Sequence, residues 1–508
     1  MDIKPVKPIH IALFFAVVLL SLALLSLVFP KDGIKITDEL ELKFLSCQQI
    51  NEEAPTYANL DSILREARLM DSLSTVVIEQ KKDTVKEKTD KPKIDTIRAA
   101  ANLLRSKIHR IEYPKGKENM LVPFFSQLNS GSTQKSLIRI LHYGDSQIEG
   151  DRITRFLRNR FQQKFGGSGP GLLPCFNPVG SNTSMKISTV GPWAKHTVMM
   201  RSDSIFPRKN YGILGSCARI ETTDSIKKGQ LNYKISKYSY LSVRHFKWAR
   251  LFFGQGAGNF KLSVYEKDKL LLQDVVDGSG PLNYFGLQLE HTPEDLTYEV
   301  EGDSLPCFYA LSLDQPTGIA IDNIGWRGSR GAEFYKIQTS VLKRFFKELN
   351  VKMIVFQFGV NVVPLITNNY GFYERQLIRQ LTHLKDAAGE IPILVVGVSD
   401  MARKENGWYA SYPNIEKIRN AQRNAAFKSN CAFWDMYKAM GGKNSMPAWV
   451  FAQPPLAQKD FTHFNFNGAK IIAQMLYNAI MYEVNNKQSE SQTAEKTEAA
   501  SENQAQSL

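Results

Sequence analysis

The sequence predicts a doubly wound α/β domain that is interrupted by an all-β segment. Three observations predict this organisation: short apolar runs that alternate with helical patterns, a long stretch of period-two patterning between two of those runs, and one N-terminal apolar run of membrane-spanning length. A chain of 508 residues is also too long for one ordinary core, so more than one folded unit is expected.

The parallel strands are predicted from apolar runs rich in Ile and Val, which are Leu137–Tyr143, Gly318–Asn323, Met353–Phe358, Ile391–Val398 and Ala432–Trp434. Such nearly continuous runs are typical of parallel strands buried on both faces. Helical patterns lie between or after them, with apolar residues on one face at Ile153–Phe161, Val341–Leu349 and Ile471–Ile480. The α/β domain is therefore expected over residues 121–180 and 315–485.

The all-β segment is expected over residues 181–314. Period-two stretches such as Tyr238–Arg244 and Lys261–Glu266 alternate with glycine-rich turns at Gly254–Gly258 and Gly278–Gly280. That pattern predicts a small β-sandwich. Because the segment lies between the first and second predicted parallel strands, an insertion is more economical than a separate sequential domain.

The N-terminal apolar run, Ile11 to Phe29, is long enough to cross a hydrocarbon core of about 30 Å. Lys4 and Lys7 precede it, so the positive-inside rule places the short N-terminus in the cytoplasm. A cleavable signal peptide is the alternative, but Leu27–Pro30 offers no small-x-small cleavage site. We therefore expect residues 1–30 to be an uncleaved anchor and the rest of the chain to lie outside the cytoplasm, in the periplasm or an equivalent compartment.

Two polar stretches flank the predicted domains. Residues 31–120 are expected to form a partly disordered stalk, since residues 80–93 are charged and almost free of large apolar side chains. Short amphipathic helices are expected on either side of that charged stretch. Residues 486–508 are rich in Ser, Gln, Glu and Ala and contain no aromatic residue, which predicts a disordered tail.

The formal net charge is +14. In an exported chain this charge indicates anionic glycan or phospholipid headgroups rather than nucleic acid, and a merely solvated basic surface is the equal alternative. The five cysteines show no metal-binding or redox spacing, and no cofactor motif is present. An oxidising compartment permits a disulfide, and Cys217 and Cys307 bracket one segment, although the pairing cannot be read from sequence.

Ser146 is the first candidate for chemistry. The first predicted parallel strand runs into Gly144-Asp-Ser146 and is followed directly by a helical pattern. Ligand sites in open α/β sheets form at the carboxyl ends of strands, where a serine is well placed as a nucleophile and its backbone N–H is available to an oxyanion. Serine and aspartate also cap helices routinely, so this block alone favours the capping role.

Three further blocks follow the later strands. They are a glycine-rich turn, an amide donor and an acid–histidine pair before the last helix: Asn323-x-Gly-x-x-Gly328, Gly359-x-Asn361 and Asp460-x-x-His463. The histidine can take a proton from Ser146 while Asp460 holds the imidazole in the required tautomer. Each block has a structural alternative as a turn, a cap or a loop residue, but four blocks in order at strand ends favour a catalytic site.

Together the four blocks resemble the signature blocks of the SGNH/GDSL hydrolase superfamily, and the match spans Leu137–Gly171 and Gly318–Tyr482. The resemblance implies a flavodoxin-like three-layer α/β/α fold and an enzyme that cleaves or transfers acyl esters. It also implies Ser146 as the nucleophile, His463 as the general base and Asp460 as the acid that orients it. The implied oxyanion hole combines the backbone N–H groups of Ser146 and Gly328 with the side chain of Asn361.

The chain departs from that family in two places: Gln147-Ile148 stands where a leucine usually follows the serine, and the all-β segment separates the first two blocks. Asp435, near the end of the fifth predicted strand, is the main rival to Asp460 as the acid. The loop Gly166–Gly171 lacks the Lys-Ser/Thr of a phosphate loop and is expected to lie near the site. Two other polar residues at this strand are expected to be structural, namely His142 and Asp145.

The resemblance and the predicted anchor together imply a substrate at the cell envelope, with hydrolysis or transfer of a small acyl group, expected to be acetyl, on a carbohydrate. Similar anchored domains occur in bacterial glycan O-acetylation systems, which implies a multispanning membrane acyltransferase as a partner. Hydrolysis and transfer both pass through an acyl-enzyme, so these residues do not separate them. The alternative from another class is a catalytically silent glycan-binding or assembly protein that binds through its all-β segment.

Overall fold

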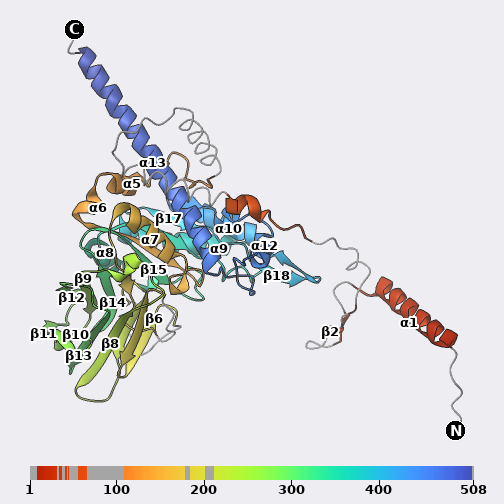
Figure 1. The fold of residues 1–508 in the computed structure, drawn as a ribbon, viewed down its shortest axis with the longest axis horizontal. Coiled ribbons are helices and arrows are strands. Elements are labelled where there is room, and N and C mark those ends of the chain that lie inside the picture. Colours follow the sequence, from red (N-terminus) through yellow and green to blue (C-terminus); the bar gives the residue numbers. More distant parts are fainter. Residues whose placement is uncertain are drawn as a thin grey trace, which may run out of the picture. The chain divides into compact units, whose positions relative to one another are not determined.

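The computed structural model describes residues 8–30, 34–36, 41–42, 44, 55–65, 108–177, 183–200 and 211–505. The chain divides into two compact units, one of residues 1–56 with 403–410 and one of residues 57–402 with 411–508 (Figure 1). In the first unit, helix α1 (Pro8–Val28) is long and apolar enough to cross a membrane. A short antiparallel pair follows it, β1 (Ile34–Lys35) with β2 (Glu41–Leu42).

The second unit contains a five-stranded parallel sheet. Its strands in spatial order are β15 (Gly318–Gly325), β3 (Leu137–Gly144), β16 (Val351–Gln357), β17 (Ile393–Val396) and β20 (Ala432–Trp434). Each strand coincides with one of the predicted apolar runs, and in chain order the sheet reads 2-1-3-4-5, a common doubly wound order. In the register, Gly144 lies opposite Gly325 on one side and Gln357 on the other, so three strands end level.

Helices pack on this sheet through apolar faces. One buried cluster joins Leu141, Tyr143 and Phe356 of the sheet to α8 (Thr339–Glu348), α9 (Gly371–Ala388) and α10 (Ile415–Lys428). Elsewhere α7 (Thr154–Phe165) packs on β15, and α13 (Phe466–Ala505) packs on α7 and on α5 (Val122–Asn129). Short helical pieces complete the unit: α6 (Ser132–Lys135), α11 (Met436–Ala439), α12 (Ser445–Phe451), η1 (Glu149–Asp151), η2 (Leu241–Arg244) and η3 (Phe334–Lys336).

Between β3 and β15 the chain forms two antiparallel sheets, which we call the β segment (residues 185–314; Figure 1). One sheet has the order β11 (Lys269–Asp277), β10 (Asn259–Glu266), β13 (Asp295–Gly302), β8 (Lys227–Ile235) and β5 (Met185–Val190). The other has β12 (Asn283–Gln288), β9 (Trp248–Gly254), β14 (Cys307–Asp314), β7 (Ser216–Ile220) and β6 (Trp193–Thr197), with β4 (Gly171–Leu173) beside β14. Alternating residues of both sheets share one buried core, as in a sandwich.

Arg139 of β3 links the β segment to the parallel sheet. Its fully buried guanidinium donates to Asp322 of β15 at 2.7 Å and to Asp314 of β14 at 2.6 Å. Asp322 also accepts the backbone N–H of Leu172 at 2.8 Å. Burial alone would lower the pKa of Arg139, but the two carboxylates more than offset it, and the guanidinium stays charged.

The predicted stalk ends earlier than expected. Ile111 is buried, Glu112 pairs with Phe433 of β20, and Trp434 donates its indole N–H to the carbonyl of His109. Since β20 is an edge strand, its backbone groups need partners, and residues 109–112 provide them. The folded unit therefore includes residues from 108 onward that composition assigned to the stalk. The charged stretch at 80–93 lies outside the described residues.

The tail also differs from the expectation, because α13 continues to Ala505 where composition predicted disorder from residue 486. Glu, Gln, Lys and Ala have high intrinsic helix propensity, which explains a helix without an apolar pattern. Among the described cysteines none forms a disulfide, although Cys217 and Cys307 are both buried on the neighbouring strands β7 and β14.

The expectation for the loop Gly166–Gly171 was wrong. Ile319 at the start of β15 donates its N–H to the carbonyl of Gly166, and a side chain at Gly167 would collide with the same strand. The loop thus lies at the amino end of the strands, opposite the level ends of β3, β15 and β16. The reason is geometric: α7 runs back along the sheet after Ser146, so the loop after this helix emerges at the other edge.

Replacing Arg139 by methionine should lower the free energy of unfolding by about 3–5 kcal/mol, because two buried carboxylates would lose their cation. Urea unfolding of the full-length protein in detergent, followed by circular dichroism, measures this. Lys228→Met is the matched control, since Lys228 is exposed and its ion pairs with Glu299 and Glu301 should contribute less than about 1 kcal/mol. Equal effects of the two substitutions would contradict the structural role given to Arg139.

Candidate active site

The site lies where β15, β3 and β16 end level at the carboxyl edge of the parallel sheet. Three loops leave this edge, and they carry Ser146 after β3, Gly328 after β15 and Asn361 after β16. Gly144 is required at the end of β3, because a Cβ there would lie 2.7 Å from the carbonyl oxygen of Gln357. Close packing of the strands therefore brings the three loops together.

The structure brings Ser146, His463 and Asp460 together in a hydrogen-bonded chain. The Ser146 hydroxyl lies 2.8 Å from Nε2 of His463, and Nδ1 of the same imidazole lies 2.7 Å from Oδ2 of Asp460. With the proton on Nδ1, the imidazole donates to the carboxylate, and Nε2 is left to accept from the serine. These are the contacts expected of a nucleophile, a general base and the acid that orients it.

Asp460 is held ionised by its surroundings. Partial burial raises the pKa of Asp460. Hydrogen bonds from the backbone N–H and imidazole of His463 and from the N–H of Thr462 lower it by more, so the pKa lies below its ordinary value. The rival acid Asp435 lies elsewhere, where it caps α11 and forms an ion pair with Arg419 at 3.0 Å. Asp435 is therefore not part of the hydrogen-bonded chain through His463.

Two backbone N–H groups in the loops at this edge of the sheet have no acceptor in the described part of the chain. Within the described part of the chain, neither the N–H of Ser146 nor that of Gly328 donates a hydrogen bond. Gly328 has a φ of +80°, a conformation that favours glycine. Asn361 donates one amide hydrogen to the carbonyl of Ser329 at 2.8 Å, so it lies beside the Gly328 loop. Its second amide N–H can donate to another acceptor.

Asp145 joins two of the loops. Its buried carboxylate accepts the N–H of Gln147 at 3.0 Å and, through the other oxygen, the N–H groups of Gly359 at 3.0 Å and Val360 at 3.3 Å. Burial raises the pKa of Asp145 to about 6, although the three backbone donors and the nearby imidazole of His463 oppose the rise. The residue before the nucleophile therefore holds the segment that carries Asn361, the structural role expected from the sequence.

Gln147 holds the segment that carries His463. Its buried amide donates to the carbonyl of Thr462 at 2.6 Å and to the hydroxyl of Ser399 at 3.0 Å, and its oxygen accepts the N–H of Phe464 at 3.4 Å. The peptide groups on both sides of His463 are thus tied to the residue after Ser146. In the sequence Gln147 stands out only as a departure from the family pattern, and that departure is the signal for this role.

The remaining polar groups of the strand ends are structural. His142 is buried, with Nε2 2.9 Å from the side-chain oxygen of Gln357, and burial lowers the pKa of His142 to about 4. It therefore stays neutral at physiological pH. Across the described residues no group of His, Cys, Asp and Glu side chains has the geometry to hold a metal ion.

Comparison with known proteins places the fold. No known protein-family model and no curated protein sequence matches the chain. Among solved structures, a peptidoglycan O-acetylesterase matches with a TM-score of 0.55 and 19% identity, over 72% of this chain and 96% of that one. At this identity the likeness concerns the fold alone.

Two other solved structures match less closely. A salicylyl-acyltransferase from a tetracycline biosynthetic pathway has a TM-score of 0.25 and 11% identity, over 60% of this chain and 95% of that one. A family two carbohydrate esterase from Clostridium thermocellum has a TM-score of 0.23 and 8% identity, over 59% and 99%.

Replacing Gln147 by leucine should lower kcat for 4-nitrophenyl acetate about 10-fold or more with little change in KM, because the His463 segment would lose its hydrogen bonds without any loss of substrate contacts. Steady-state kinetics of the full-length protein measures the effect. Gln147→Glu keeps an acceptor for Phe464 but loses the donors to Thr462 and Ser399, so its kcat should fall as far as that of the leucine variant. A proportional rise in KM instead would show that Gln147 contacts substrate.

The pH dependence of stability should carry the signature of Asp145. Its folded pKa of about 6 lies above the unfolded value of 3.8, so its contribution is fully present below about pH 4 and is lost as pH rises through 6, by about 3 kcal/mol in all. Asp145→Asn should remove that fall from the free energy of unfolding between pH 4 and 7. Burial raises the pKa of Asp400 to about 6 as well, but its contribution is the same in both proteins and cancels when the two slopes are compared. Parallel slopes would contradict the assignment.

Proposed function

We propose that the protein is a serine-dependent ester hydrolase or acyltransferase that acts on a small acyl group, expected to be acetyl. The observation that carries this proposal is the continuous relay from Ser146 through His463 to Asp460, with two free backbone donors at the same sheet edge. The fold shared with a peptidoglycan O-acetylesterase supports it.

The residues suggest the order of steps. His463 accepts the proton of Ser146 as Oγ attacks the ester carbonyl, and the oxyanion that forms is stabilised by the N–H groups of Ser146 and Gly328 and by the amide of Asn361. Collapse of this intermediate breaks the ester C–O bond, and the leaving alcohol takes the proton from His463. The acyl group then remains on Ser146. Asp460 stabilises the imidazolium of His463 from the moment it takes the serine proton until it passes that proton to the alcohol.

The acyl-enzyme has two fates. Water activated by His463 releases the acid and restores Ser146, whereas a sugar hydroxyl in place of water completes a transfer. The relay lies partly open to solvent, since the side chain of His463 is 24% exposed and that of Asp460 is 44% exposed. Solvent access of this kind favours hydrolysis, with transfer dependent on an acceptor that displaces water.

We assign the parallel sheet and its helices to a three-layer SGNH domain and the β segment to an inserted domain. We further propose that α1 anchors the chain in a membrane, with the catalytic part on the extracytoplasmic side and an envelope glycan as substrate. The length and apolarity of α1 and the charge pattern before it support this placement. A multispanning acyltransferase remains the proposed donor if the reaction is a transfer.

Acyl-enzyme formation tests the proposal. Full-length protein in detergent is mixed with 4-nitrophenyl acetate, and the intact mass should increase by one acetyl group in the wild type and not in Ser146→Ala. Turnover of the same ester should fall by more than about 10³-fold in that variant. Absence of both adduct and turnover in folded wild-type protein would favour a catalytically silent glycan-binding protein instead.

A further inference from the structure

A pocket of about 280 Å³ lies beside the site, between the parallel sheet and the β segment. Its walls come from both parts of the unit. The lining residues that matter below are Glu149, Asn323 and Arg327 near the ends of the parallel strands and Lys195, Thr197 and Ser216 of the β segment. Small-molecule sites usually range from about 300 to 1,000 Å³, so this pocket suits a single sugar residue rather than a chain.

The pocket adjoins the reacting groups through short stretches of chain. Glu149 follows Ser146 by three positions, and Arg327 directly precedes Gly328. These two residues pair across the pocket rim at 2.7 Å. A group held in the pocket is therefore near an ester placed at Ser146, although neither Ser146 nor His463 lines the pocket itself.

The wall contributed by the β segment is firmly attached. The indole N–H of Trp326 donates to the carbonyl of Leu214 at 2.9 Å, and the hydroxyl of Tyr143 donates to the carbonyl of Ile213 at 3.0 Å. Gly215 packs so closely on Trp326 that a Cβ would lie 2.5 Å from the indole ring. The pocket is thus a built feature of the unit rather than a gap between loosely attached parts.

Lys195 is the unexpected member of this wall. On β6 it shares a strand face with Trp193, whose ring lies in the buried core of the sandwich, so an apolar side chain would be ordinary at this position. Within the described residues the ammonium group of Lys195 has no hydrogen-bond or ion-pair partner. Burial lowers the pKa of Lys195, and Glu149 opposes the fall only through space.

The charged residues that line the pocket leave one positive charge in excess, since Lys195 and Arg327 are cations and Glu149 is the acid. Arg152, which donates to the carbonyl of Ser146 at 3.2 Å, interacts through space with Glu149 and Arg327. A partly buried, unpaired ammonium group is costly unless a ligand supplies an acceptor.

We propose that this pocket is a subsite for a carboxylate-bearing sugar residue, and that Lys195 is the residue of the β segment that binds its carboxylate. The inference rests on the proposed function, because it names the class of glycan that the esterase site acts on. A single carboxylate matches the local excess of one charge, and the hydroxyl and amide groups of Thr197, Ser216 and Asn323 suit the sugar hydroxyls. The β segment thereby selects the substrate while the parallel sheet carries the chemistry.

Acetate release tests the proposal on two O-acetylated glycans that present the carboxylate differently. One is acetylated polygalacturonate, with the acid on the ring, and the other is peptidoglycan strands freed of stem peptides, with the acid on an ether substituent. Each is used as the free acid and after carbodiimide coupling to methylamine, which removes the charge. The glycan preferred as the free acid identifies the source of the carboxylate.

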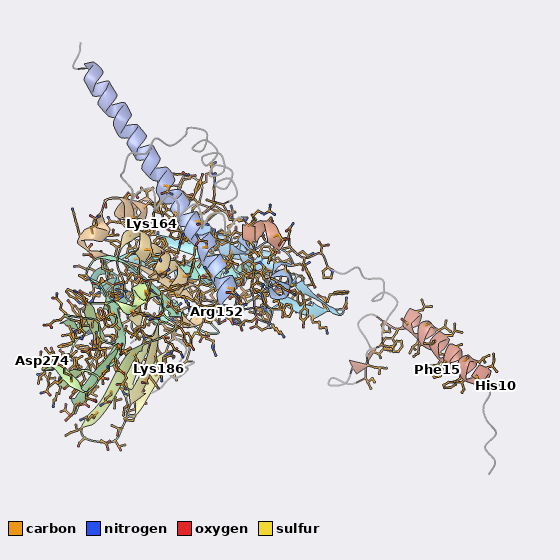
Figure 2. All side chains as sticks on the ribbon, in the orientation of Figure 1. His10, Phe15, Arg152, Lys164, Lys186 and Asp274 are labelled. Carbon is orange, nitrogen blue, oxygen red and sulfur yellow. The ribbon has the colours of Figure 1, made fainter. Side chains whose placement is uncertain are left out.

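Lys195→Gln should lower kcat/KM for the preferred free acid about 10- to 100-fold, the usual effect of losing a hydrogen bond between charged groups. The loss on the amidated glycan should be much smaller, and Lys195→Arg should restore most of the loss on the free acid. Lys186→Gln is the matched control, because it removes the same charge from an exposed position of the β segment (labelled in Figure 2) that does not line this pocket. Equal losses on acid and amide would overturn the proposal in favour of a neutral sugar site.

Binding separates failure of the subsite from failure of the proposed function. Calorimetry of the deacetylated free-acid glycan with Ser146→Ala needs no turnover, and adding Lys195→Gln should weaken Kd about 10- to 100-fold. If 4-nitrophenyl acetate is not turned over but this binding difference remains, the catalytic proposal fails and the subsite stands. If turnover is present and neither Kd nor kcat/KM depends on Lys195, the subsite proposal is wrong.

Discussion

The site depends on one constraint, the level ending of β15, β3 and β16. Because Gly144 faces Gly325 and Gln357 in the register, three loops begin at the same height and converge on one point. Hydrogen bonds then fix each loop to the next, through Asp145 to the loop after β16 and through Gln147 to the His463 segment. Pairing of the parallel strands thus brings the loops together, and the two buried polar side chains on either side of Ser146 fix their relative positions.

The order of interactions explains why the relay is well formed without a bound ligand. Ser146 is flanked by Asp145 and Gln147, whose side chains bond to other partners, and its own hydroxyl bonds to His463. Within the described residues the N–H groups of Ser146 and Gly328 donate no hydrogen bond, and Gly328 has a positive φ.

Much of this could be predicted from sequence. Continuous apolar runs identified every strand of the parallel sheet, because strands buried on both faces have no polar alternation to obscure them. The candidate triad was also predicted, since its residues sit next to strand and helix boundaries. The choice of Asp460 over Asp435 needed three-dimensional proximity, and so did the clamp made by Gln147, whose partners are more than 300 residues away in the chain.

Other features were hidden because they rest on contacts with no local signature. Residues 109–112 look like linker until the exposed edge of β20 is seen beside them. The loop Gly166–Gly171 was placed at the wrong edge because composition does not reveal where a returning helix delivers the chain. Lys195 is one lysine among many in a basic sequence, and only the pocket around it distinguishes it.

Only three residues separate β14 from β15, and Arg139 bonds to an aspartate in each of these strands. The β segment therefore cannot move away from the Gly328 loop that follows β15 without breaking a buried ion pair. Such a rigid connection would fix the distance between a ligand group bound by the β segment and an ester bond placed at Ser146. On a polymer with a regular chemical repeat, fixed spacing becomes regioselectivity: the enzyme would act at one hydroxyl position of each repeat and pass over identical esters at the others.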